Sequence, residues 1–145
     1  MGHETSIERT PDGRRVVAAR EIDASRETVW EILTDTEQWP AWGPSVRAVD
    51  CDRRYVEAGT TGRVRIPGGI WVPFRVTTCE DYRWTWRVAK VPATGHRVDA
   101  AGEGCRAVFE IPLPAAGYAP VCWRALERIE ALATESERSS ETARD

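Results

Sequence analysis

Between Gly43 and Ile111 the hydrophobic pattern alternates with a period of two residues, and clusters of turn residues divide it into six short segments. This alternation is typical of strands that bury one face, and short turns between consecutive strands favour antiparallel pairing. The sequence therefore predicts an antiparallel meander. Its expected strands cover residues 45–55, 60–67, 70–80, 82–91, 95–101 and 104–111.

The segment before the meander predicts one strand and two short helices. "GRRVVAAREID" alternates as a strand does, and Ser25 is a good N-cap for a helix that follows it. We expect a second helix to start at Thr34 or Asp35, because Thr34 and Glu37 fit a capping box. The Trp39-Pro40 step should end that helix, since the residue before a proline is pushed out of the helical region.

A long amphipathic helix of about five turns is expected after the last strand. Its apolar face is formed by Tyr118, Cys122, Ala125, Leu126, Ile129, Leu132 and Ala133. The order of elements predicts an α+β fold in which seven antiparallel strands curve around this helix and leave an internal cavity. We divide the chain into a flexible polar leader (1–13), one domain (14–134) and a polar, frayed C-terminal tail (135–145).

Charge and composition exclude several classes of function. Twenty basic residues are scattered among 23 acidic ones, which gives a net charge of −3 and no basic stripe for nucleic acid. We expect no integral membrane association, because no apolar run approaches the roughly 18 residues that a span requires. We find no secretion signal in the first residues, which favours a cytoplasmic protein.

The cysteines favour buried free thiols over a metal site. Cys51, Cys79, Cys105 and Cys122 are widely spaced and form no C-x-x-C pair, although zinc sites usually cluster their ligands. Nucleotide-binding and hydrolase motifs are also missing from the sequence. We therefore expect neither a metal nor a cofactor.

The stretch "EIDASRETVWEILTDTEQWPAWGPSVRAV", with its spaced Val-Trp, Trp-Pro and Trp residues, resembles the opening of the START-like helix-grip (SRPBCC) superfamily. Gly62, "RWTWRV", His96, "GCRAVFEIPL" and the terminal helix follow in the order of the polyketide cyclase/dehydrase-like branch. The resemblance covers residues 14–134 and implies a helix-grip fold with a cavity between the sheet and the last helix. In that family the Trp39–Trp42 junction closes one end of the cavity.

Strand phase gives a set of candidate pocket residues. Side chains that share the inward face include aromatic and aliphatic groups and one histidine, which suits a small apolar ligand. The same set would equally fill a cavity-free core, and both interpretations stay open. The expected pocket residues are Trp42, Phe74, Val76, Trp84, Trp86, His96, Val98, Phe109, Tyr118 and Cys122.

The expected function is binding or carriage of a hydrophobic small molecule that is lipid-like, aromatic or polyketide-like. The alternative is a polyketide cyclase, aromatase or dehydratase with His96 as acid/base and Tyr118 as a weaker catalytic candidate. Asp99 and Glu110 fall on the outward, solvent-facing phase, so no inward carboxylate is evident to complete a catalytic pair. A bonded interior histidine is the structural alternative for His96, and a chaperone-activating module is a third class. We expect a monomer or a weak dimer.

Overall fold

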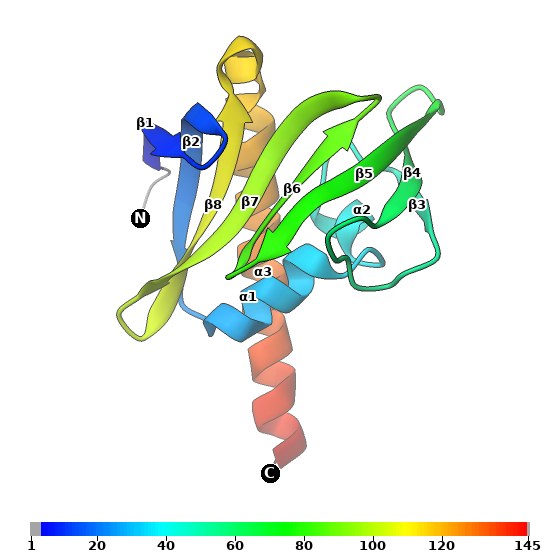
Figure 1. The fold of residues 1–145 in the computed structure, drawn as a ribbon. Helices are drawn as coiled ribbons and strands as arrows, with labels where there is room; N and C mark the ends of the chain where they lie inside the picture. Colours follow the sequence, from blue (N-terminus) through cyan, green and yellow to red (C-terminus); the bar gives the residue numbers. More distant parts are fainter. Residues whose placement is uncertain (1–3, 145) are drawn as a thin grey trace.

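The computed structural model describes residues 4–144 as an open, strongly curved antiparallel sheet that wraps around one long helix (Figure 1). Two short helices connect the second and third strands, and a 3-10 turn, η1, precedes the long helix. The elements are β1 (Glu4–Thr10), β2 (Gly13–Ile22), α1 (Arg26–Thr34), α2 (Trp39–Trp42), β3 (Ala48–Cys51), β4 (Thr61–Arg65), β5 (Trp71–Glu80), β6 (Arg83–Val88), β7 (Val91–Ala101), β8 (Gly104–Pro112), η1 (Leu113–Tyr118) and α3 (Ala119–Arg144).

The sheet has the strand order β1-β2-β8-β7-β6-β5-β4-β3, and every neighbouring pair is antiparallel. The helix-grip fold is thus present, with eight strands in place of the seven expected. The additional strand, β1, comes from the segment that we expected to be a flexible leader. That segment alternates poorly in hydrophobicity, so its sequence carries no strand signal.

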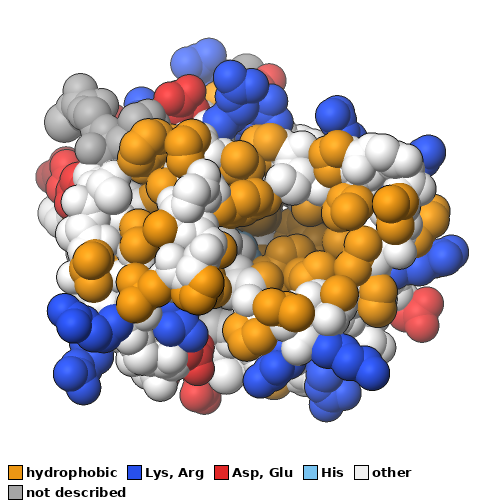
Figure 2. All heavy atoms as spheres, turned by 90° about the horizontal axis from the view of Figure 1, so that it is seen from above, with side chains coloured by type: hydrophobic (Ala, Val, Ile, Leu, Met, Phe, Trp, Pro, Cys, Tyr) orange, Lys and Arg blue, Asp and Glu red, His pale blue; other side chains and the backbone are white. Residues whose placement is uncertain are grey.

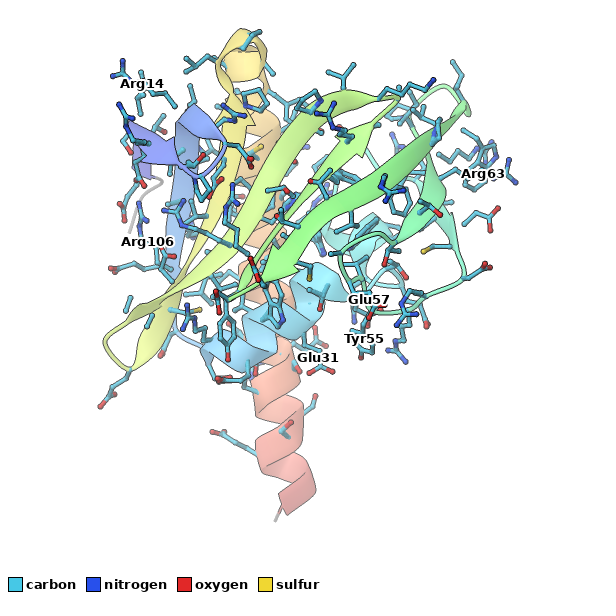
Figure 3. The ribbon with its side chains drawn as sticks, viewed as in Figure 1. Arg14, Glu31, Tyr55, Glu57, Arg63 and Arg106 are labelled. Carbon is cyan, nitrogen blue, oxygen red and sulfur yellow. The ribbon has the colours of Figure 1, made fainter. Side chains whose placement is uncertain are left out.

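Ion pairs hold β1 against the sheet where apolar burial does not. Arg97 donates to Glu8 at 3.0 Å, and Arg106, labelled beside β1 in Figure 3, donates to Glu4 at 3.3 Å. The turn that follows β1 adds Asp12, whose carboxylate lies 2.9 Å from Arg83 on the distant strand β6. The β1–β2 hairpin therefore crosses the outer face of the sheet.

The β6–β7 hairpin turn differs from expectation. Ala89 and Lys90 connect β6 to β7, and both have a positive φ, as two-residue turns of the type I′ class require. Neither residue is a usual turn former for that geometry, so we expected the turn at residues 92–95 instead. Those four residues belong to β7, which begins at Val91.

Two tryptophans fix the C-terminal end of α1. The indole N–H of Trp39 donates to the carbonyl of Leu33 at 3.0 Å, and that of Trp42 donates to Ile32 at 3.2 Å. Carbonyls in the last turn of a helix have no partner within the helix, so these bonds satisfy groups that would otherwise be buried unpaired. The local geometry explains why tryptophans gather at this junction.

The second helix differs from the expected one in its bounds. Thr34 ends α1, and its hydroxyl bonds back to the carbonyl of Trp30 at 2.9 Å instead of capping a new helix. Helix α2 begins at Trp39, and Pro40 lies in its first turn, where the missing N–H has no cost. Pro40 thus starts the helix that we expected it to end.

Helix α3 continues through the segment that we expected to be a frayed tail. Its buried face presents Cys122, Leu126 and Ile129 to the sheet, and further along it packs against α1. Glu137 lies in the segment that we expected to be a tail. It accepts hydrogen bonds at 2.8 Å from the backbone N–H of Ser25 and from the hydroxyl of Thr28. A carboxylate at the N-terminus of α1 is also favoured by the helix dipole.

The outer face of the sheet contains a buried charge that we expected to face solvent. Glu110 is only 2% exposed, because the β1–β2 hairpin and two arginines cover it. Arg83 lies 2.7 Å from one of its carboxylate oxygens, and Arg97 lies 2.8 Å from the other. Burial acts to lower the pKa of Arg97, but its bonds to Glu110, Asp99 and Glu8 outweigh burial and raise it.

Candidate functional site

Aromatic side chains occupy most of the space between the sheet and α3. The indole of Trp39 stacks on that of Trp84 at a centroid distance of 5.2 Å, and Trp86 meets Trp39 edge-on at 5.3 Å. What remains is an inner cavity of about 50 Å³, walled by these rings, Trp42 and residues of α3. The aromatic rings therefore fill most of the space between sheet and helix, and a small cavity remains.

His96 lies at the wall of this inner cavity and is 2% exposed. Its ring stacks on Trp84 at 4.0 Å, Nε2 lies 3.1 Å from the hydroxyl of Thr94, and Nδ1 lies 3.4 Å from the carbonyl of Trp84. Burial lowers the pKa of His96 to about 3, against the opposing effect of the Trp84 carbonyl. The imidazole is therefore neutral at physiological pH, with both nitrogens engaged.

A second, larger cleft of about 310 Å³ opens at the upper end of the molecule, between η1 and the ends of strands β4, β6 and β7. Figure 2 looks onto this end and shows a hollow with hydrophobic walls. Apolar side chains dominate its lining. The cleft is lined by Ser45, Val46, Val64, Ile66, Trp86, Val88, Pro92, Ala93, Thr94, Pro112, Ala115 and Tyr118.

We call this larger space the outer cleft. It shares five wall residues with the inner cavity: Ser45, Val46, Trp86, Thr94 and Tyr118. Tyr118 donates a hydrogen bond to the hydroxyl of Ser45, which joins η1 to the segment between α2 and β3. This bond lies where the two spaces adjoin. The cleft is thus the mouth of the site, and the aromatic cavity is its inner end.

The expected pocket residues divide into two groups. Trp42, Trp84, Trp86, His96, Phe109, Tyr118 and Cys122 all line the inner cavity. Phe74, Val76 and Val98 point inward as their strand phase predicts, but they are buried in the packed core and line neither space.

Sequence reasoning missed most of the outer cleft. Its walls come from Pro92 and Thr94, which we assigned to a turn, and from Pro112 and Ala115, which follow the last expected strand. Ser45 and Val46, which we expected to begin the first strand of the meander, precede β3, which starts at Ala48. No signal in the sequence of these segments predicted a cleft.

The walls of the two spaces offer apolar contact and a few neutral polar groups. Burial raises the pKa of the Cys122 thiol to about 12 and, with smaller effects from neighbours, also raises that of Tyr118. No aspartate or glutamate is among the described residues that line either space. Within residues 4–144, no cluster of three or more His, Cys, Asp or Glu is arranged to hold a metal ion.

Two buried indole N–H groups in these walls lack a hydrogen-bond partner. The Nε1 atoms of Trp84 and Trp86 make no hydrogen bond to any described residue. Buried indole N–H groups are usually bonded, because an unpaired donor in an apolar interior has a free-energy cost of about 1–3 kcal/mol. Both donors are thus enclosed and unpaired at the inner end of the site.

None of the helices in the described chain is long and apolar enough to span a lipid bilayer.

Several solved structures share this fold at low sequence identity. Protein Ms6760 from Mycobacterium smegmatis is 16% identical, with a TM-score of 0.61, and the match covers 92% of this chain and 99% of that one. Protein BH1534 from Bacillus halodurans is 14% identical, with a TM-score of 0.65 and coverages of 81% and 94%. The Aha1 dimer from Colwellia psychrerythraea is 17% identical, with a TM-score of 0.60 and coverages of 81% and 94%.

Comparison by sequence gives the family. None of the curated proteins matches the chain. The profile of one family, described as polyketide cyclase / dehydrase and lipid transport, matches residues 13–134. That match covers every element from β2 to the middle of α3, including all the walls of the inner cavity and the outer cleft. The chain therefore belongs to the polyketide cyclase / dehydrase and lipid transport family.

Proposed function

We propose that the protein binds or carries an apolar small molecule, lipid-like, aromatic or polyketide-like, whose body occupies the outer cleft and whose tip approaches the aromatic inner cavity. The observation that carries this proposal is the apolar cleft of about 310 Å³, a volume at the lower end of the range for ligand pockets. Its five residues in common with the inner cavity give a ligand a continuous wall to follow.

The unpaired indole donors favour a ligand with one hydrogen-bond acceptor at its tip. A carbonyl or ether oxygen that reaches Trp84 or Trp86 through a shift of the surrounding rings would satisfy an Nε1–H that has no partner among the described residues. A purely aliphatic chain would leave both donors unpaired. We therefore favour an aromatic or polyketide-like ligand with a carbonyl over a simple alkane.

Binding is favoured over catalysis by the state of His96. An acid/base group works best with a pKa near the working pH, whereas burial lowers the pKa of His96 to about 3. A cyclase would also need a hydrogen-bond donor to hold a developing enolate, and the hydroxyl of Tyr118, the catalytic candidate for that role, is already bonded to Ser45. The free thiols of Cys105 and Cys122 fit a reducing compartment such as the cytoplasm.

The test uses the fluorescent probe 1-anilinonaphthalene-8-sulfonate and a variant that fills the cleft. Val88 lines the cleft at the end of β6, so Val88→Trp should weaken probe binding about tenfold or more by occupying its space. Val49→Trp is the matched control, because Val49 is also a partly buried strand valine packed on the core but lines neither space.

Two results would overturn the proposal. One is no saturable probe binding by the folded wild-type protein, and the other is equal loss of binding in both tryptophan variants. Turnover of a poly-β-keto substrate that disappears in a folded His96→Ala variant would replace binding with the enzymatic alternative.

A further inference from the structure

The exposed apolar side chains of this protein concentrate at the end where the cleft opens. Five of the seven large hydrophobic residues exposed in the described chain lie on η1 or on the hairpins around the cleft. Ile70 and Val91 are the most exposed, at 62% each, and they occupy the β4–β5 turn and the start of β7. The five are Ile70, Trp71, Val91, Leu113 and Tyr118.

The same end carries positive charge with almost no negative charge. No Asp or Glu occurs in residues 58–79, 82–98 or 111–126, which build the cleft end of β4–β7 and all of η1. Arg65, Arg87 and Lys90 come from these stretches, and Arg14, labelled in Figure 3, adds a cation from the β1–β2 hairpin. Arg63 also belongs to them, but it pairs with Asp50 of β3 at 2.8 Å. Asp12 of that hairpin is neutralised by Arg83.

The chain as a whole is acidic, with a net charge of −3, so this distribution is strongly polarised. Figure 2 shows the result: Lys and Arg side chains surround a hydrophobic region with a hollow, and the acidic side chains seen on this face lie at its border. Apolar groups at the centre with cations at the border match the requirements of a lipid surface, where acyl chains and anionic headgroups lie in successive layers.

We propose that this end, defined by Ile70, Trp71, Val91 and Leu113 with the surrounding Arg and Lys residues, docks on the surface of a lipid bilayer that contains anionic lipids. The side chains of Ile70, Trp71, Val91 and Leu113, which we call the apolar tips, enter the boundary between headgroups and acyl chains. The Arg and Lys side chains contact the headgroups. Trp71 fits this position, because Trp is favoured at membrane interfaces and the guanidinium of Arg63 lies 4.7 Å from its ring centre.

Docking in this orientation places the mouth of the cleft against the bilayer. An apolar ligand could then pass between membrane and cleft without crossing water. This consequence rests on the proposed ligand function, but the docking itself does not, since it uses only surface residues. Ile70 and Val91 line neither the cleft nor the inner cavity, so the two proposals can be tested separately.

The experiment measures sedimentation of the full chain with vesicles of phosphatidylcholine alone and with vesicles that also contain phosphatidylserine. We expect binding to the anionic vesicles, weakening as salt is raised, and little binding to the neutral ones. The variant Ile70→Asp/Val91→Asp removes the two most exposed apolar tips and adds repulsive charge. It should lower the partition coefficient about tenfold or more.

Ile7→Asp is the matched control for the apolar tips. Ile7 is 59% exposed and lies on β1, an edge strand, and it lines neither the cleft nor the inner cavity. The control should bind anionic vesicles as the wild type does. Absence of vesicle binding by the folded wild type, binding that ignores lipid charge, or equal loss in Ile7→Asp would each overturn the docking proposal.

Probe binding separates this outcome from the ligand proposal. The Ile70→Asp/Val91→Asp variant should keep the wild-type affinity for the fluorescent probe in vesicle-free buffer. Loss of vesicle binding with retained probe binding supports docking by the tips. Vesicle binding by a wild type that binds no probe would leave docking intact and remove only the ligand function.

Discussion

At the scale of single residues, His96 shows how burial determines chemistry. The ring is enclosed by Trp84, Phe109 and Trp42, and its two nitrogens contact a hydroxyl and a carbonyl. A charged imidazole would lose water without gaining an anionic partner, so the neutral form prevails. The residue acts as a polar element of an aromatic wall.

This state makes stability depend on pH. The pKa of His96 is lowered from 6.5 to about 3 on folding, so the unfolded chain takes up a proton that the folded chain refuses as pH falls below 6.5. The free energy of unfolding should therefore fall by about 2–3 kcal/mol from this group between pH 7 and pH 4.5. Urea denaturation of wild type and His96→Phe at both pH values would measure it.

The His96→Phe variant keeps the aromatic stack but has no group to protonate, so its stability should change less over the same interval. An equal pH dependence in the two proteins would contradict the burial argument. The carboxylates contribute alike to both proteins and cancel in the comparison.

Strand phase predicted which side chains face inward better than it predicted what surrounds them. Trp84, His96 and Phe109 point inward because a period of two leaves no other choice within a paired strand. Burial of Glu110 on the opposite face depends on Arg83 and Arg97, which in turn pair with acidic residues of the β1–β2 hairpin, remote in sequence. Periodicity is a local signal, so it does not indicate that a segment distant in sequence buries a side chain.

At the scale of elements, α1 is held at both ends by other parts of the chain. Trp39 and Trp42 bond its last carbonyls, and Glu137 of α3 bonds the residues that begin it. Nine residues form too short a helix to be stable alone in water. The helix therefore depends on these tertiary contacts.

Removing the carboxylate of Glu137 should weaken this attachment. We expect Glu137→Ala to lower the free energy of unfolding by about 1 kcal/mol, since the Ser25 N–H and the Thr28 hydroxyl both lose an acceptor. Thermal unfolding would measure the change. Glu135→Ala, on the exposed side of the same helix turn, is the control and should have no measurable effect.

Helices and strands were predictable where a hydrophobic pattern extended over many residues. They were ambiguous where a boundary depended on a single residue. Six period-two segments and an amphipathic helix gave the helix-grip order. Pro40 fitted the end of one helix and the start of another, and only the packing of Trp39 decides between them. The turn at Ala89–Lys90 uses positive φ values that nothing in those two side chains predicts.

At the scale of the whole molecule, the sheet is open and its two edges are β1 and β3. Open edges invite pairing with another chain unless they are short or charged. Strand β3 has four residues, and β1 carries Glu4, Glu8 and Arg9. Neither edge presents a long apolar strand.

We therefore predict that the protein is a monomer at micromolar concentrations, which sedimentation velocity would measure. Strand addition at an edge would instead give a dimer that dissociates on dilution. If a dimer forms, Ile7→Asp would identify β1 as its interface by abolishing it, because Ile7 is the exposed apolar residue on that strand.

Trp42 has two roles, and together they predict how ligand binding in the inner cavity would affect α1. Its ring forms part of the wall of the inner cavity, and its indole N–H donates a hydrogen bond to the carbonyl of Ile32. A ligand large enough to displace that ring must also break this hydrogen bond to the end of α1 and leave only the bond from Trp39. Amide hydrogen exchange in the final turn of α1 would then become faster when a ligand occupies the inner cavity. The exchange rate of these backbone amides would therefore distinguish the ligand-bound from the ligand-free protein.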